Sequence, residues 1–211
     1  MTIRQIGFEK TAKTIIKELE KRNIDGYFCE SSEKAVELVL ALLPKNASIG
    51  WGGSETIKEC GLMDALAKGD YELIDRATAK TPEERREIYG RTVMADAFLM
   101  STNAITENGE LVNIDGASNR LACLLHGPKE VYVLVGMNKL VSDVEAAIGR
   151  IRNTACPANT IRLDRKTPCS MTGKCGNCFG DESICSNIVV TRRSSFPNRI
   201  KVILIAENLG Y

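Results

Sequence analysis

Neither sign of charge is in excess in this sequence, which has 28 Lys and Arg residues against 27 Asp and Glu residues in a total of 211. A protein that attracts nucleic acid or an anionic membrane through its overall field carries a clear basic excess. We therefore expect no nucleic acid and no membrane surface among its partners.

Long apolar segments are also missing. No run approaches the ~20 apolar residues that cross a bilayer, and residues 1–13 carry charges where a secretory signal would have an uninterrupted apolar core. Repeats of solenoid period are absent as well. These absences predict a soluble cytoplasmic protein without membrane insertion, in a reducing compartment that disfavours stable disulfides.

Cysteine, in contrast, is plentiful, and half of the eight cysteines lie in one short segment rich in glycine and polar residues. They follow the spacing C-x5-C-x2-C-x6-C, as Cys169, Cys175, Cys178 and Cys185. Intervening glycines permit the tight turns that would bring four sulfur donors to one point. We therefore predict a metal centre, with free thiols, a disulfide or a redox pair as the alternatives.

The spacing also bears on the type of centre. Zinc sites commonly use two short pairs of ligands, whereas only Cys175 and Cys178 form such a pair here. The sequence therefore favours an iron–sulfur cluster, with zinc as the alternative, and the single histidine, His126, is distant in sequence. Cys156 is either a further or replacement ligand or a small buried apolar residue.

Strand-like and helix-like segments alternate along the chain, as in an α/β domain whose mostly parallel sheet is covered by helices on both faces. Helices are predicted over 3–21, over 32–43 with Ser32 as the cap, and from 82 toward 97 behind a capping box at Thr81. Strands are predicted over 27–29, 47–51, 98–101, 131–135 and 202–205. We expect one domain over 1–211, with a C-terminal cysteine-rich loop as a metal-binding insertion at about 156–190.

A glycine-rich loop stands where a predicted strand passes into a helix. Its candidate ligand-binding residues are Gly50, Gly52, Gly53, Ser54 and Thr56. Backbone amides and hydroxyls in such a loop suit a phosphate or carboxylate, although the loop matches neither a Walker motif nor the dinucleotide fingerprint. The alternative is a tight turn in which Ser54 only caps the helix.

Two turns follow in the middle of the chain. Asn108-Gly109 between apolar runs predicts a hairpin, which would make Glu107 a solvated residue of the turn. Asp115-Gly116 is a second turn, with Asn119 and Arg120 nearby, at the end of a strand-like segment. Ligands gather at the carboxyl ends of strands in open α/β sheets, so we expect Gly116 and Asn119 to contact a ligand.

Four stretches together resemble the LUD-domain lactate-utilisation family: the Gly50–Thr56 loop, TENGELVNIDGASNR, EVYVLVGMNKLV and IKVILIAENLGY. The resemblance extends over most of the chain. It implies the NagB/RpiA/CoA-transferase-like fold, an α/β sheet with helices on both faces, whereas a shared fold does not by itself define an activity.

The same resemblance implies three candidate catalytic residues. Class I CoA transferases of that superfamily carry a Ser-Glu-Asn-Gly motif whose glutamate attacks an acyl-CoA, and Glu107 is the matching position. Its ribose-phosphate isomerases use an Asp-Gly-Ala element and a later lysine, which Asp115 and Lys139 resemble. Asp115 would then be a base and Lys139 would stabilise an enolate, with a solvated loop lysine as the alternative for Lys139.

Two functions follow. In the first, whose lactate setting the family resemblance implies, the chain would be a subunit of a cytoplasmic system that oxidises L-lactate to pyruvate, or of a related redox system. It would bind a small anionic ligand and the cysteine-held metal centre. Its partners would be other subunits of a lactate-oxidising complex or a second copy of itself. In the second, it is a stand-alone enzyme, CoA-transferase-like or isomerase-like, that acts on a phosphorylated or CoA-linked small molecule and holds a structural zinc.

Two further features have an ordinary structural interpretation. Arg192, Arg193 and Arg199 follow the cysteine segment and are expected to face solvent. Trp51, the single tryptophan, is expected to pack beside the glycine loop, with stacking on a bound ring as the alternative.

Overall fold

The computed structural model describes residues 2–211. Its helices are α1 Ile3–Glu20, α2 Ser32–Leu42, α3 Glu55–Glu59, α4 Leu62–Leu66, α5 Pro82–Val93, α6 Asn119–Leu125, α7 Val144–Arg150, α8 Cys156–Arg162 and α9 Pro168–Thr172. Its strands are β1 Asp25–Cys29, β2 Ser48–Trp51, β3 Glu72–Ile74, β4 Ala97–Met100, β5 Ala104–Thr106, β6 Leu111–Asp115, β7 Glu130–Gly136, β8 Leu140–Val141, β9 Asn187–Thr191 and β10 Ile200–Ile205. Short 3-10 turns cover Arg76–Thr78 and Met137–Lys139, and a π-helical turn covers Ile151–Ala155.

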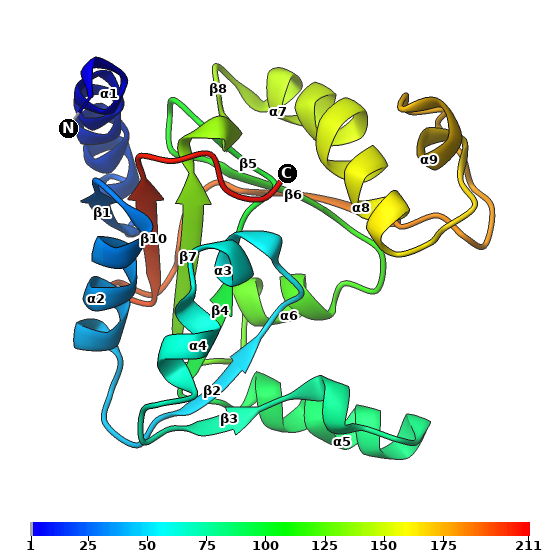
Figure 1. Cartoon of the computed structure of the whole chain (residues 1–211), viewed down its shortest axis with the longest axis horizontal. Coiled ribbons are helices and arrows are strands. Elements are labelled where there is room, and N and C mark those ends of the chain that lie inside the picture. The colour runs from blue at the N-terminus through cyan, green and yellow to red at the C-terminus, as the bar shows by residue number, and fades with distance from the viewer. Residues whose placement is uncertain (1) are drawn as a thin grey trace.

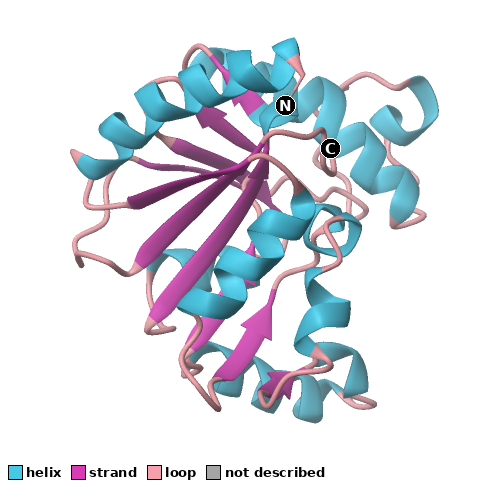
Figure 2. Ribbon diagram, turned by 60° about the vertical axis from the view of Figure 1, so that its left-hand side comes forward, coloured by secondary structure: helices cyan, strands magenta, loops and turns pink. Residues whose placement is uncertain are grey.

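The strands form two sheets in the part of the chain that the structure describes. The larger one has six parallel strands in the order β1-β10-β7-β4-β2-β3, and helices lie on both of its sides (Figure 2). The smaller one, β8-β5-β6-β9, mixes parallel and antiparallel pairs. The predicted α/β class with a mostly parallel, doubly covered sheet is therefore confirmed.

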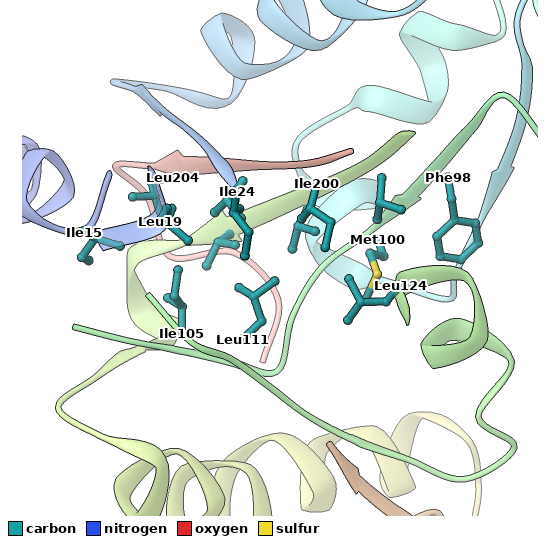
Figure 3. Packing of buried hydrophobic residues seen from close by; sticks show 14 of the residues in the cluster. Ile15, Leu19, Ile24, Phe98, Met100, Ile105, Leu111, Leu124, Ile200 and Leu204 are labelled. Carbon is teal, nitrogen blue, oxygen red and sulfur yellow. The ribbon is translucent and has the colours of Figure 1, made fainter. Parts of the chain in front are cut away.

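The larger sheet buries both faces of its inner strands β4, β7 and β10, which are apolar at nearly every position. In β7, Val131, Val133 and Val135 point toward α1 and α6, and Figure 3 shows this side of the core. Tyr132 and Leu134 point the other way, toward α2, α3 and α4. Each such side chain stabilises the fold by about 1.5–3 kcal/mol when it leaves water.

The smaller sheet lies between this core and a helical layer. One face adds Ile105 and Leu111 to the cluster that contains α1. The other face packs through Val112 and Ile114 against Ile151 and the rest of the layer formed by α7, the π-helical turn and α8. Figure 1 shows this layer and α9 on one side of the molecule, so the cysteine-rich region is attached next to the small sheet.

Several local predictions are confirmed and others need correction. The hairpin at Gly109 and the capping box at Thr81 are present. The cap of α2 is Ser31, because its side chain accepts the Lys34 amide, while the Ser32 hydroxyl donates to Glu207. The cysteine-rich region is not only a loop, since it contains α8 and α9.

Arg199 needs a third correction, because it is buried and does not face solvent. Its guanidinium donates to the carbonyl oxygens of Pro128, Leu124 and Cys123 at 3.0, 2.7 and 2.7 Å. Two of these carbonyls belong to the last turn of α6, which has no further partner for them within the helix. Arg199 therefore caps the carboxyl end of α6 through its side chain.

Within residues 2–211, none of the helices combines the length and the apolar character that a membrane span requires.

Candidate functional site

The carboxyl ends of the parallel strands meet at one edge of the larger sheet, where they border a cavity of about 730 Å³. Ligands of open α/β sheets bind at this edge. The wall includes residues that follow β2, β4, β6 and β7: Gly53, Ser54, Thr56, Ser101, Asn103, Gly116, Asn119 and Lys139, together with Asp115 at the end of β6. Segments far apart in sequence thus contribute to one site.

Lys139 is the most unusual group in this wall. Its side chain is 4 % exposed, and its Nζ donates to the hydroxyls of Thr56 and Ser101 at 2.7 and 2.9 Å. Burial, with a smaller contribution from the positive charges of Arg150 and Arg120, lowers the pKa of Lys139 to about 7. Lys139 therefore gains or loses its charge near neutral pH. Its two contacts are neutral hydroxyls, so the charged form has no carboxylate in hydrogen-bond contact.

Arg120 and Asp115 form an ion pair beside Lys139. The Arg120 Nε lies 3.1 Å from Asp115 Oδ2, and both side chains are largely buried. The guanidinium also donates to Asn103 and to the carbonyls of Ser101 and Ile114. These contacts hold Arg120 at the cavity wall, and Asp115 already has a cationic partner.

The glycine-rich loop makes room for two arginines. A Cβ on Gly52 would lie 3.1 Å from Arg120 Cγ, and a Cβ on Gly53 would lie 2.6 Å from Arg76 Nη2. A larger residue at either position would therefore displace the arginine side chain that packs against it. The Ser54 hydroxyl accepts the Ile57 amide, so it caps α3 as the alternative interpretation held.

The C-terminal residues cover the site from the other side. Figure 1 shows the chain leaving β10 and crossing toward α3. The Leu209 carbonyl accepts the Thr56 hydroxyl, and the Gly210 amide donates to Glu59 at 2.6 Å. Tyr211 follows in the cavity wall, where it lies close to Arg162 and Glu55. The tail therefore completes the enclosure around Lys139.

A comparison with protein-family models shows the family of this chain. A family model described as LUD domain matches residues 12–205. The chain belongs to the LUD domain family. This match confirms the family resemblance that the sequence motifs indicated.

Solved structures resemble the LUD domain as well. A DUF162 family protein from Deinococcus radiodurans shares 14% identity at a TM-score of 0.52, over 94% of this chain and 98% of that one. Ribose 5 phosphate isomerase A from Neisseria gonorrhoeae shares 15% identity at a TM-score of 0.33, over 58% and 60% of the two chains. eIF2B delta from Chaetomium thermophilum shares 12% identity at 0.33, over 66% and 54%. A comparison with curated proteins gives no match.

The cavity of the LUD domain gathers some of the predicted site residues and omits others. Gly53, Ser54, Thr56, Asp115, Gly116, Asn119 and Lys139 line it. Gly50 lies in β2, where a Cβ would meet Thr92, and Gly52 packs against Arg120; neither glycine lines the cavity. Glu107 is exposed in the turn between β5 and β6, where its amide donates to the Val141 carbonyl, and it is not part of the wall. The solvated alternative for Lys139 is wrong, because this lysine is buried.

The four predicted metal ligands do not form a ready site. Cys169 is buried beside the hydroxyls of Thr160 and Thr167, Cys175 and Cys178 are half-buried, and Cys185 is exposed. Among residues 2–211, no three Cys, His, Asp or Glu side chains gather closely enough to hold a metal ion. The metal centre stays a prediction.

The shortest approach between two cysteines in this region involves Cys156, for which the sequence allowed either a ligand role or a structural one. Its Sγ lies 3.5 Å from the Cys185 Sγ, and Cys156 also lines the cavity. The hydrogen bond with Cys156 lowers the pKa of Cys185 to about 7. The same hydrogen bond, together with burial, raises the pKa of Cys156. The cysteine segment therefore folds over Cys156, next to the cavity.

Sequence reasoning missed several polar residues of the wall: Arg76, Tyr89, Ser101, Asn103, Arg162 and Tyr211. Ser101 could have been found, because it directly follows the buried strand β4 and the carboxyl ends of such strands carry ligand contacts. The others come from helices, turns and the tail, which reach the cavity only through tertiary packing.

Proposed function

We propose that this LUD domain binds a small anionic ligand at its cavity and works in a lactate-utilisation system that converts L-lactate to pyruvate, or in a related redox system. The observation that carries the proposal is the buried Lys139 beside Arg120 at the carboxyl edge of the sheet. In such a system its partners would be other subunits of a lactate-oxidising complex.

The charges around the cavity favour an anion. Asp115 offsets Arg120, whereas Lys139 contacts two neutral hydroxyls. Protonating Lys139 places an uncompensated charge in a low-dielectric site, and a carboxylate or phosphate oxygen would stabilise that charge. Thr56 and Ser101 hold the amine in place, so a ligand would meet a cation that is already oriented.

Binding of sulfate, lactate and pyruvate, measured by calorimetry, tests the proposal. Lys139→Met should weaken binding about ten-fold or more, because a charged hydrogen bond contributes about 1.5–3 kcal/mol. Lys129→Met is the matched control, since Lys129 is exposed and precedes the same strand, β7, at its opposite end. Equal affinities in the two variants would refute an anion site at Lys139.

The cysteine-rich region is proposed to hold an iron–sulfur cluster, with zinc as the alternative. The support is the donor chemistry: soft thiols collected in one segment, with Cys156 close to Cys185. Sulfurs around one zinc ion lie about 3.8 Å apart, since zinc–sulfur bonds of about 2.3 Å point to the corners of a tetrahedron. Metal analysis and visible absorbance after purification without oxygen distinguish iron, zinc and empty thiols.

A stand-alone enzyme is the second candidate, and one observation favours an isomerase-like form over a CoA-transferase-like form. Asp115 and Lys139 line the same cavity, whereas Glu107 lies outside it. Proton transfer by Asp115 with Lys139 stabilising an enolate would need both groups at one substrate. Glu107→Gln should then leave turnover of a phosphorylated substrate unchanged, and Asp115→Asn should abolish it.

A further inference from the structure

A second, apolar pocket adjoins the cavity. It has a volume of about 400 Å³, and its wall includes Trp51, Val93, Phe98, Ala122 and Cys123. These residues come from the carboxyl end of β2, from β4, and from the facing sides of α5 and α6. The proposed anion site does not account for this pocket.

The pocket and the cavity share part of their walls. Arg76, Tyr89, Ala117 and Asn119 line both of them. The Arg76 guanidinium lies over Gly53 at this border, and among residues 2–211 no hydrogen bond or ion pair engages it. A ligand that extends from the cavity into the pocket would therefore lie next to the Arg76 guanidinium, which could donate hydrogen bonds to it.

The size and chemistry of the pocket suit a ring. A cavity of roughly 150 Å³ with apolar walls accepts benzene, so about 400 Å³ exceeds what one ring requires. Water in the pocket finds few polar partners, and an apolar group that displaces weakly held water gains affinity. Trp51 and Phe98 offer aromatic surfaces against which a ring packs favourably. Lactate, with one methyl group, would leave this pocket unused.

We propose that the ligand of this LUD domain has two parts: an anionic group that binds at Lys139 and Arg76, and an apolar group of aromatic-ring size that fills the pocket between Trp51, Phe98 and Ala122. The ligand class is a phosphate or carboxylate that bears an aryl group. This inference rests on the proposed anion site and specifies what that site recognises.

Titration of the whole protein with phenyl phosphate and with inorganic phosphate tests the inference. Phenyl phosphate should bind about ten-fold to hundred-fold more tightly, because a buried ring adds the transfer free energy of an apolar side chain. Trp51 is the single tryptophan, so its emission reports the pocket directly. Phenyl phosphate should shift this emission, and inorganic phosphate should leave it nearly unchanged.

A matched pair of variants locates the ring. Ala122→Leu adds three carbons to the pocket wall and should remove the advantage of phenyl phosphate without changing phosphate affinity. Ala122→Ser keeps the side chain small and should keep the advantage. Far-UV circular dichroism verifies that the Ala122→Leu variant is folded, and the Trp51 emission of the wild type gives the answer independently of any variant.

The outcomes separate the two proposals. Equal affinity of the wild type for both compounds overturns the ring pocket and leaves the anion site standing. Tighter binding of phenyl phosphate that Ala122→Leu does not weaken, without a change in Trp51 emission, also overturns it. If neither compound binds, the anion site fails and the ring pocket fails with it.

Discussion

The Nζ of Lys139 lies 2.7 Å from the Thr56 hydroxyl oxygen, although the two residues are 83 positions apart in sequence. This contact joins the 3-10 turn after β7 to the first turn of α3, and thereby connects two strand ends at the cavity. A neutral hydroxyl as the partner leaves the charge of the ammonium uncompensated. The chemistry of the site therefore depends on the protonation of Lys139.

Anion binding should weaken as the pH rises through 7. Burial lowers the pKa of Lys139 to about 7, so raising the pH from 6 to 8 removes most of the cationic form. If that form alone binds, the apparent Kd should rise about ten-fold. Sulfate is the suitable probe, because it keeps its charge over this range. A flat profile in the wild type, or the same slope in Lys139→Met, would contradict the prediction.

Stability should depend on the same proton. The folded protein releases it near pH 7, whereas an unfolded lysine holds it up to about pH 10.4, so the unfolded state binds more protons between these values. The free energy of unfolding should therefore rise with pH, by up to about 1.4 kcal/mol per unit above pH 7. Lys139→Met should lack this rise, and urea unfolding of both proteins at pH 7.0 and 8.5 measures the difference in slope.

Loss of one thiol should empty the proposed metal centre. After anaerobic reconstitution with iron and sulfide, Cys185→Ser should lose most of the bound iron and the visible absorbance, because a thiolate ligand is missing. Cys60→Ser is the control, since Cys60 is buried on the other side of the core and donates to the Ile57 carbonyl as a serine would. Unchanged iron in Cys185→Ser would exclude Cys185 as a ligand.

Replacing Arg199 should destabilise the whole fold. Arg199→Met leaves three buried carbonyl oxygens without donors, two of them at the end of α6, which should cost about 2–4 kcal/mol. Arg193→Met removes an exposed arginine of the same region and should have little effect. Equal urea midpoints for the two variants would show that the contacts of Arg199 contribute nothing to stability.

Much of the fold could be predicted because local patterns agree with it. The apolar run Val131–Val135 forms β7, and the capping box at Thr81 opens α5, as periodicity and capping chemistry predicted. Alternation of strands and helices then leaves few topologies other than a parallel sheet with both faces covered. The family follows from motifs that are spread along the same elements.

Part of the candidate site could also be predicted. Gly53 and Thr56 follow β2, and parallel strands bring such positions to one edge of the larger sheet. Asp115 ends β6 in the smaller sheet, so its place at the cavity depends on how the two sheets pack. Sequence reasoning on Cys169 and its neighbours gave the donor chemistry. It did not give the distances between sulfurs, because a loop rich in glycine has no periodic constraint on its path.

The sequence by itself determined the fold class and the family, since these follow from patterns between neighbouring residues and from motifs along the strands and helices. Only the tertiary structure decided that Lys139 is buried against two neutral hydroxyls, that Glu107 lies outside the cavity, and that Cys156 approaches Cys185. Burial and charge pairing depend on residues that are distant in sequence. They arise when helices, turns and the C-terminal tail pack around the sheet.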